Sequence, residues 1–256
     1  MSRTATGILD PMDNLIALVT GANKGIGREI ARQLAAAGHT VYVGSRDAER
    51  GKATTRDVGG DARLLVLDVT NGESIAAAAR QVPSLDILVN NAGISSEEPN
   101  DVTEEDPEEF RRVYETNVFG VVAVTNAFLP ALRRSAHPRI VNISSGTASI
   151  AASAGMGEGV VAYASRPTGT LAAYRSSKTA LNELTVLYAN ALADDGFKVN
   201  ALAPGLRRTT LNGPARSSSA AGDPAEGAAG AVRLALLPDD GPTGGFFSWD
   251  GTTVPW

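Results

Sequence analysis

Seven short apolar segments alternate with longer helix-like segments, and this alternation is the strongest constraint on the fold. Most of the apolar segments are continuous runs without polar alternation, which is typical of parallel strands covered on both faces. We predict strands at residues 15–20, 40–45, 62–69, 86–90, 139–144, 198–203 and 244–249. Strands that alternate with helices indicate βαβ units. The sequence therefore predicts an α/β fold: a single doubly wound Rossmann-type domain over 14–256, with a seven-stranded parallel sheet flanked by helices on both faces, after a flexible N-terminus at 1–13.

Three helices are predicted from periodicity and end signals. Residues 25–38 carry apolar side chains every four residues, which forms one buried stripe. Asp106 and Pro107 form a capped start for a helix that continues to about Arg134. Residues 173–196 predict a third long helix. Its inward-facing side chains are predicted to be Leu181, Leu184, Leu187, Tyr188 and Leu192.

Two segments rich in small residues, 146–173 and 214–231, follow the predicted strands at 139–144 and 198–203. In a doubly wound sheet, the loops at the carboxyl ends of the strands form the ligand crevice. We predict that both segments border a binding site; the alternative is an insert without a role.

The composition excludes several classes of function. The chain has no cysteine and two histidines, so we predict no metal site. Its net charge is −5 and its charges are interspersed, unlike the basic footprint of a nucleic-acid-binding protein. No apolar run approaches the roughly 18 residues that span a membrane, and residues 1–13 lack the apolar core of a signal peptide. We expect a cytoplasmic protein with no nucleic-acid or membrane partner.

The sequence TGANKGIG, residues 20–27, lies between the first predicted strand and the first predicted helix. Its glycines allow a tight turn and a close approach to a ligand, and the helix N-terminus offers unpaired N–H groups to a phosphate. The predicted cofactor contacts in this turn are Gly21, Asn23, Lys24, Gly25, Ile26 and Gly27. The alternative is a tight strand-to-helix connection without a ligand.

The end of the second strand indicates which dinucleotide binds. A carboxylate at this place would accept hydrogen bonds from the adenosine ribose, but the chain has Gly44-Ser45-Arg46. Arg46 and Lys24 could hold a 2′-phosphate, which favours NADP(H) over NAD(H). Alternatively, both are ordinary surface cations, and Asp47 could neutralise Arg46 by pairing with it.

Two tyrosines near the start of the third helix are candidates for chemistry. Tyr174 and Lys178 are four residues apart and share a helical face. A nearby ammonium lowers the pKa of a phenol from about 10, as does the positive charge of oxidised nicotinamide, and a lowered pKa suits the phenol for general acid–base catalysis. Tyr163 has no cation four residues later and lies before Pro167. We predict that Tyr174 is the catalytic tyrosine and that Tyr163 is an ordinary loop residue. The alternative for Tyr163 is a contact with the substrate.

Five motifs in order resemble the short-chain dehydrogenase/reductase family, and its carbonyl-reductase-like branch in particular. They are TGANKGIG, NNAG (90–93), NISS (142–145), YRSSK (174–178) and PG (204–205), and they cover nearly the whole chain.

The resemblance implies a catalytic tetrad of Asn117, Ser145, Tyr174 and Lys178. Ser145 would bind the substrate oxygen and Tyr174 would move the proton. The backbone carbonyl of Asn117 would hold a water that relays protons to Lys178. Strand alternation points the neighbouring Ser144 the other way. The structural alternatives are a buried asparagine, a serine that begins a turn and a surface lysine.

The resemblance also implies further cofactor contacts. Asp68 and Val69 should flank the adenine, and Asn91 should line the cofactor groove. Gly93 is included among these contacts, although it and Asn90 would mainly tie the central strands together. The remaining contacts come from Pro204, Gly205 and Thr209, and Thr209 should meet the nicotinamide carboxamide. The family often has an acidic residue next, where this chain has Thr210.

These features predict an NADPH-dependent oxidoreductase that reduces a ketone or aldehyde to an alcohol, reversibly. Small residues in the two loops favour a spacious pocket for a bulky ketone. The alternatives are an NADP(H)-sensing regulator without turnover, or an epimerase or dehydratase on the same scaffold.

Many family members assemble through the helices that begin here near 107 and 173. The segment 146–173 is longer than is usual in the family and could cover that surface. We therefore expect a monomer.

Overall fold

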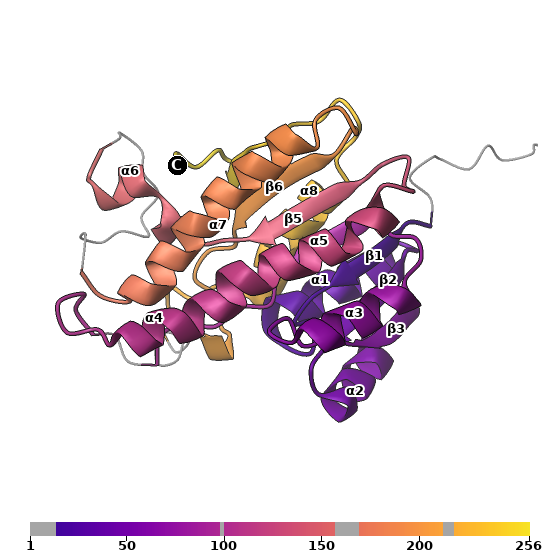
Figure 1. The fold of residues 1–256 in the computed structure, drawn as a ribbon, viewed down its shortest axis with the longest axis horizontal. Coiled ribbons are helices and arrows are strands. Elements are labelled where there is room, and N and C mark those ends of the chain that lie inside the picture. Colours follow the sequence, from indigo (N-terminus) through magenta and orange to yellow (C-terminus); the bar gives the residue numbers. More distant parts are fainter. Residues whose placement is uncertain (1–13, 98–99, 157–168, 212–217) are drawn as a thin grey trace, which may run out of the picture.

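A computed structural model describes residues 14–97, 100–156, 169–211 and 218–256. Its strands form one parallel sheet in the order β3-β2-β1-β4-β5-β6-β7 (Figure 1). The strands are β1 (Ile16–Val19), β2 (Thr40–Ser45), β3 (Asp61–Val66), β4 (Ile87–Asn90), β5 (Arg139–Ile143), β6 (Lys198–Ala203) and β7 (Phe246–Ser248). The predicted strands and the predicted fold class are confirmed.

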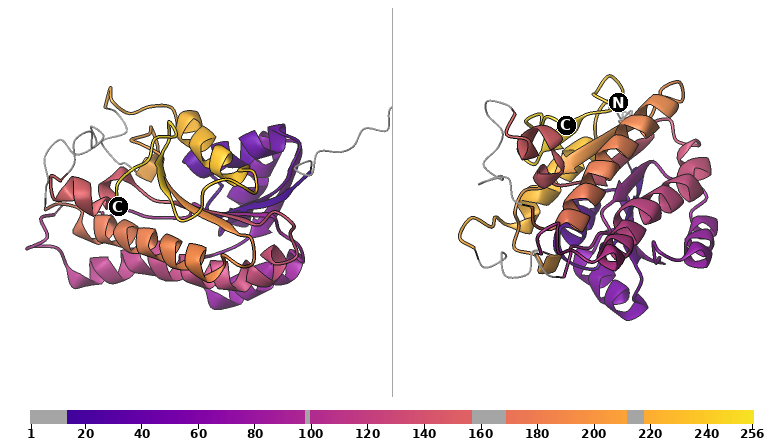
Figure 2. Two further views of the ribbon diagram at one scale, coloured as in Figure 1. Left: turned by 90° about the horizontal axis from the view of Figure 1, so that it is seen from above. Right: turned by 60° about the vertical axis from the view of Figure 1, so that its left-hand side comes forward.

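Helices cover both faces of the sheet. They are α1 (Gly25–Ala36), α2 (Ala48–Val58), α3 (Gly72–Gln81), α4 (Pro107–Tyr114), α5 (Gly120–Leu132), α6 (Ile150–Ser153), α7 (Ala172–Ala191) and α8 (Pro224–Ala235). Seen edge-on, α1 and α8 lie on one face, while α5 and α7 lie on the other (Figure 2). Among the described residues, no helix is both long and apolar enough to span a membrane.

The core is divided by the sheet into two apolar clusters. Val19 of β1 belongs to the cluster that packs under α1 and α8. Leu18, the preceding residue, belongs to the cluster that packs under α3, α5 and α7 together with Phe128. Successive side chains of a strand point to opposite faces, so both must be apolar where both faces are covered. This explains why the strands appear in the sequence as continuous apolar runs.

The sheet has a switch point beside β1, which pairs with β2 on one side and with β4 on the other. Chain connections leave in opposite directions from such a point, and a crevice opens at the carboxyl ends of the strands. The glycine-rich turn follows β1 and therefore lies at this crevice.

The helix predicted from 107 to about 134 is interrupted. A π-helical turn at Glu115–Phe119 separates α4 from α5, and the Gly120 N–H bonds to the Glu115 carbonyl five residues earlier. A Cβ on Gly120 would lie 2.9 Å from the Val69 carbonyl oxygen. This close approach to the loop after β3 is a long-range contact that helical periodicity does not reveal.

The prediction that Leu187 faces inward is wrong, since it is 51% exposed. Ala189 is the buried residue of this turn. The two residues are about 200° apart around the helix, given 3.6 residues per turn.

The segment 214–231 is not a loop throughout, because α8 begins at Pro224. The Asp223 carboxylate caps it by accepting the Ala225 N–H at 2.9 Å. A Cβ on Gly227 would lie 3.0 Å from the Pro204 carbonyl oxygen, and one on Gly230 would lie 3.0 Å from Trp249 Cα. The small residues in this segment, which by themselves indicate a loop, allow α8 to pack closely against Pro204 and Trp249. Residues 157–168, with Tyr163, and 214–217 lie outside the described residues, so the predictions on them stay untested.

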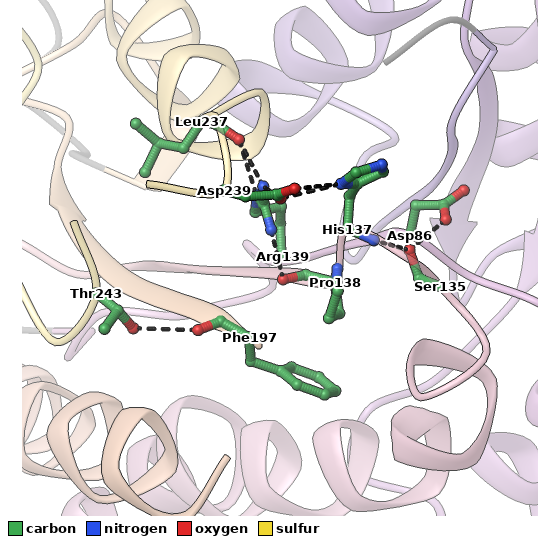
Figure 3. A network of polar contacts seen from close by, with 9 residues as sticks. All are labelled: Asp86, Ser135, His137, Pro138, Arg139, Phe197, Leu237, Asp239 and Thr243. Carbon is green, nitrogen blue, oxygen red and sulfur yellow. Dashed lines mark hydrogen bonds and ion pairs between the residues drawn. The ribbon is translucent and has the colours of Figure 1, made fainter. Parts of the chain in front are cut away.

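A buried guanidinium holds the amino end of β5 (Figure 3). The Arg139 side chain is 0% exposed and donates to the Leu237 carbonyl at 2.9 and 2.7 Å and to the Asp239 carboxylate at 2.6 Å. The His137 ring also contacts that carboxylate at 2.9 Å. Arg139 and then His137 hold the pKa of Asp239 below its ordinary value of 3.8. This network joins the amino end of β5 to the segment after α8. The crevice lies at the other, carboxyl end of the strands.

Replacing Asp239 by Ala is expected to lower the free energy of unfolding by about 1–2 kcal/mol, because the buried Arg139 loses its ion partner but keeps the Leu237 carbonyl, and because solvent screens the 61% exposed carboxylate. Chemical denaturation at pH 7 measures this value. Asp240→Ala removes the same charge from the next residue and is the control. The folded-state pKa of Asp239 is lowered, so its contribution is present above about pH 4 and is lost as the pH falls further. Equal stabilities of the two variants at pH 7 would contradict this role.

Candidate active site

The glycine-rich turn has a backbone that other residues rarely adopt. Gly21 and Gly25 have φ of 61° and 56°, in the left-handed region. A Cβ on Gly27 would lie 2.3 Å from Asn91 Nδ2 and 2.9 Å from the Gly21 carbonyl oxygen. The N-cap residue of α1, Lys24, makes no side-chain cap. The first N–H groups of α1 are therefore available for an anion.

Asn91 fixes this turn to β4. Its amide donates to the carbonyl oxygens of Thr20 at 2.8 Å and Gly21 at 3.2 Å, and its backbone N–H donates to the Thr20 hydroxyl at 3.0 Å. The predicted groove residue is thus also the anchor of the turn. Asn90 ties the central strands together as predicted, because its amide donates to Asn142 on β5 at 2.9 Å and to Thr125 on α5 at 3.1 Å.

The end of β2 lies beside the glycine-rich turn, since the Ala22 N–H donates to the Gly44 carbonyl at 2.9 Å. Arg46 follows and is exposed. The Asp47 carboxylate instead caps α2 and pairs with Arg50 at 3.2 Å. Across the described part of the chain, neither Arg46 nor Lys24 has an ion-pair partner within 4.0 Å. The alternative that Asp47 neutralises Arg46 is therefore wrong.

Asp68 and Val69 lie at the carboxyl end of β3, next to β2. The Asp68 carboxylate accepts the Thr70 N–H at 2.9 Å and the Thr70 hydroxyl at 2.8 Å, which closes a tight turn. Val69 packs partly buried against the core cluster under α3 and α5. Both residues lie at the carboxyl end of β3, and their contact with the adenine stays a prediction.

The loop after β6 meets the glycine-rich turn. Gly205 has φ of 78°, in the left-handed region. Thr209 is buried, and its Cγ2 lies 3.4 Å from where a Cβ on Gly25 would be. Two segments about 180 residues apart in the sequence thus form opposite sides of one site.

Tyr174 and Lys178 lie one turn apart on α7, at the carboxyl end of β5. Lys178 is 4% exposed, and its ammonium donates to the Ile143 carbonyl at 2.8 Å. The Lys178 Nζ lies 6.0 Å from the centroid of the Tyr174 ring. A Cβ on Gly93 would lie 3.4 Å from that Nζ and 3.3 Å from Asn117 Oδ1. The absence of a side chain at Gly93 therefore leaves room for the lysine and asparagine to approach each other.

Ser144 and Ser145 point in opposite directions, as strand alternation predicts. The Ser144 hydroxyl is buried and donates to Asn182 Oδ1 at 2.6 Å. The Ser145 hydroxyl lies 2.9 Å from the Thr147 hydroxyl and also bonds to the Tyr174 side chain. Ser145 does begin a turn, because it caps the short 3₁₀ helix Gly146–Ala148. Its hydroxyl is at the same time directly beside Tyr174.

Asn117 lies fully buried in the π-helical turn. Its side chain accepts the Ile94 N–H and donates to the Ile94 carbonyl, both at 2.9 Å, and donates to the Ser177 hydroxyl at 3.0 Å. The side chain therefore has the structural role that was the alternative interpretation. The predicted proton relay uses the backbone carbonyl of Asn117 and stays a prediction. Ser177 was missed in the sequence, although it lies inside the YRSSK motif.

The electrostatics of Tyr174 differ from the sequence prediction. Burial raises the pKa of Tyr174, and the hydrogen bond from Ser145 offsets only part of this rise. Burial also lowers the pKa of Lys178 to about 8. The prediction that the ammonium lowers the tyrosine pKa is wrong for this structure, because desolvation dominates for both groups. Tyr174 is consequently a protonated phenol at neutral pH, ready to donate a proton.

Two curated relatives match most of the chain. The short-chain dehydrogenase anuI of Penicillium roqueforti (strain FM164) is 38% identical over 232 residues, which cover 86% of this chain and 88% of the relative. The (−)-isopiperitenone reductase of Mentha piperita is 35% identical over 310 residues, which cover 91% of this chain and 96% of the relative.

Two solved structures have the same fold. NADPH-bound carbonyl reductase from chicken fatty liver superposes with a TM-score of 0.81 at 28% identity, covering 95% of this chain and 100% of that one. A 3-ketoacyl-(acyl-carrier-protein) reductase from Brucella melitensis, complexed with NADH, gives a TM-score of 0.79 at 27% identity, covering 93% and 97%.

The sequence model of the short chain dehydrogenase family matches residues 15–220. That range contains the glycine-rich turn, Asn117, Ser145, Tyr174, Lys178 and the loop that ends at Thr209. Together with the sheet order and the relatives above, this match shows that the chain belongs to the short-chain dehydrogenase/reductase family.

Proposed function

We propose that the protein is an NADPH-dependent reductase of a ketone or aldehyde, of the carbonyl-reductase type and reversible as an alcohol dehydrogenase. The observation that carries the proposal is the hydrogen bond between the side chains of Ser145 and Tyr174, with the Lys178 ammonium 6.0 Å from the tyrosine ring. Two hydroxyls so placed can bind one carbonyl oxygen between them.

Each residue of the site has a distinct task in this proposal. Ser145 donates a hydrogen bond to the carbonyl oxygen and polarises it. Tyr174, whose raised pKa keeps it protonated, donates its proton to the oxygen as negative charge develops there. Lys178 stabilises the phenolate that remains, and the turn at Asn117 connects the lysine to a proton relay. When bound, NADPH supplies the hydride for the carbonyl carbon.

The residues at the crevice fit NADP(H). The glycine-rich turn has no room for a Cβ at Gly27 and leaves the N-terminus of α1 available to a pyrophosphate. Lys24 and Arg46 are exposed cations beside the turn and at the end of β2, where a 2′-phosphate would be recognised. The NADPH bound to the carbonyl reductase relative supports this choice. The NADH bound to the other solved structure makes direct measurement of the preference necessary.

NADPH oxidation with a panel of carbonyl compounds that includes bulky ketones tests the activity, with NADH in parallel. In the double variant Lys24→Ala/Arg46→Ala, we expect the KM for NADPH to rise about tenfold to a hundredfold, because two charge-assisted contacts to the phosphate are lost. The KM for NADH should stay unchanged. The control is Arg50→Ala/Lys52→Ala, which removes the same charges from exposed ion pairs on α2. A wild type that prefers NADH would contradict the proposal.

We also propose that the protein is a monomer. The proposal rests on the length of the segment 146–173. Phe119 and Leu187 are exposed apolar residues on the π-helical turn and on α7. A dimer that buries these two residues is the outcome that would contradict the proposal. Light scattering at micromolar concentration decides between the two states.

A further inference from the structure

The loop after β6 contains a buried guanidinium. Arg207 is 3% exposed, although arginine is rarely buried without partners. Its Nε donates to the Pro204 carbonyl at 2.7 Å, and its Nη1 contacts the Glu226 carboxylate at 2.5 Å. The guanidinium carbon lies 4.4 Å from the centroid of the Trp249 ring, in a cation–π contact. One side chain thus joins its own loop to α8 and to the segment after β7.

The surroundings of Arg207 are shaped to this side chain. A Cβ on Gly222 would lie 2.0 Å from its Nη1, and one on Gly227 would lie 3.2 Å from its Nε. The backbone on both sides of Arg207 pairs with Gly222, because Gly222 donates to the Leu206 carbonyl and Arg208 donates to the Gly222 carbonyl, both at 3.0 Å. The segment before α8 is therefore built around the guanidinium as well as around the loop backbone.

The same loop forms one side of the cofactor site. Thr209, two residues after Arg207, packs against Gly25 in the glycine-rich turn. Pro204, whose carbonyl Arg207 holds, is the first residue of the loop. The position of the loop relative to the turn thus depends on how it is fastened to α8 and Trp249. A segment already ordered in its binding geometry loses less entropy when a ligand binds.

We propose that Arg207, clamped by Glu226 and Trp249, is a positioning residue that holds the Pro204–Thr209 segment against the glycine-rich turn and so sets the affinity for NADP(H). This inference rests on the proposed function, because it takes the cofactor site as given. Arg207 acts through the loop and does not itself contact the cofactor.

Three substitutions test separately the contacts that Arg207 makes with Pro204, Glu226 and Trp249. Arg207→Met keeps an apolar stem beside Trp249 and removes every polar contact. Arg207→Lys keeps the charge but lacks the planar donor fork needed to hold the Pro204 carbonyl and the Glu226 carboxylate together. Glu226→Gln removes the negative charge while keeping an oxygen acceptor. Arg133→Met is the matched control, since it breaks an exposed pair with Asp195, which precedes the amino end of β6, whereas the loop follows the carboxyl end of that strand.

The decisive measurement is the dissociation constant for NADPH, obtained by titration of nucleotide fluorescence at a temperature where circular dichroism shows each variant folded. We expect Arg207→Met to raise it about tenfold, equivalent to 1.4 kcal/mol, and Arg207→Lys and Glu226→Gln to raise it by smaller factors. At saturating NADPH, kcat and the KM for the carbonyl substrate should stay near the wild-type values. Adding Glu226→Gln to Arg207→Met should cause little further loss, because the two residues act as one unit. The control should bind NADPH like the wild type.

Folded variants that bind NADPH as tightly as the wild type would overturn the inference and leave the clamp a purely structural feature. A rise in the dissociation constant for NADPH that is matched by an equal rise in the carbonyl KM and an equal fall in kcat would also overturn it, because these changes together indicate that the whole site is perturbed. If Arg207→Met does not fold, the lysine and glutamine variants decide the question. A wild type that binds no NADPH overturns the proposed function together with this inference, whereas normal wild-type binding with unaffected variants overturns this inference alone.

Discussion

Replacing Tyr174 by Phe is expected to reduce the rate of carbonyl reduction about a thousandfold, within the range that general acid catalysis contributes. The substitution removes one hydroxyl and keeps the aromatic ring. Ser145 would still bind the substrate oxygen, but the phenol that donates the proton would be lost. The affinity for NADPH should stay within about twofold, because the glycine-rich turn and the Thr209 loop are untouched.

Tyr188→Phe on the same helix is the matched control, since it also removes a single phenolic hydroxyl. That hydroxyl donates to Asn126 at 2.8 Å, three to four turns away from Tyr174. Steady-state NADPH oxidation with the best substrate from the carbonyl panel measures both variants. If Tyr174→Phe retained the wild-type rate, the assignment of Tyr174 as the acid would be wrong.

Replacing Lys178 by Met is expected to abolish most activity and to increase stability at the same time. Burial lowers the pKa of Lys178 to about 8 from 10.5, so keeping the ammonium charged in the folded state costs about 3 kcal/mol. The substitution removes this cost, but it also breaks the hydrogen bond to the Ile143 carbonyl, which destabilises the variant by about 1 kcal/mol. The net gain of about 2 kcal/mol corresponds to a rise in Tm of roughly 4–8 °C for a chain of this size. A catalytic group held at a cost to stability is a common feature of enzyme sites.

The pH dependence follows from the same pKa. The folded state binds fewer protons than the unfolded state between about pH 8 and 10.5, so wild-type stability should rise with pH across this window, and the cost of the buried charge is complete below it. The reduction rate should instead fall as the pH rises through about 8, because the ammonium that stabilises the phenolate is lost.

Melting curves without added nucleotide and pH–rate profiles measure the two effects. Lys52→Met, at an exposed pair with Glu49, is the control and should change neither. A lower Tm for Lys178→Met at pH 7, or an unchanged profile above pH 8 in the wild type, would contradict this account.

Local patterns in the sequence were sufficient for the sheet and for the spacing of the reactive pair. Each strand lies between two apolar layers, so its burial is recorded in consecutive residues. The four-residue spacing of Tyr174 and Lys178 is one helical turn, and their position on one face requires no knowledge of the rest of the chain. The glycines of the turn are similar, because a positive φ at Gly21 and Gly25 is a local requirement.

Features that depend on distant neighbours were predicted wrongly or missed. The small residues at 224–231 indicate a loop when taken alone, yet they form a helix because Pro204 and Trp249 approach its glycines. The residues next to Arg207 in the sequence do not distinguish it from a surface cation. It is buried because Glu226 and Trp249, which are distant in the sequence, contact it. The π-helical turn at Glu115–Phe119 packs beside the loop after β3, which lies more than forty residues earlier.

The sequence by itself determined the seven strands, the glycine-rich turn and the spacing of Tyr174 and Lys178, because each of these depends on residues within a turn or a strand of one another. The tertiary structure alone decided the direction in which the pKa values of that pair shift. The burial of Tyr174 and Lys178 comes from strands, loops and helices that converge from the whole chain, and desolvation raises the pKa of one and lowers the pKa of the other, against the direction that their spacing alone had predicted for the tyrosine.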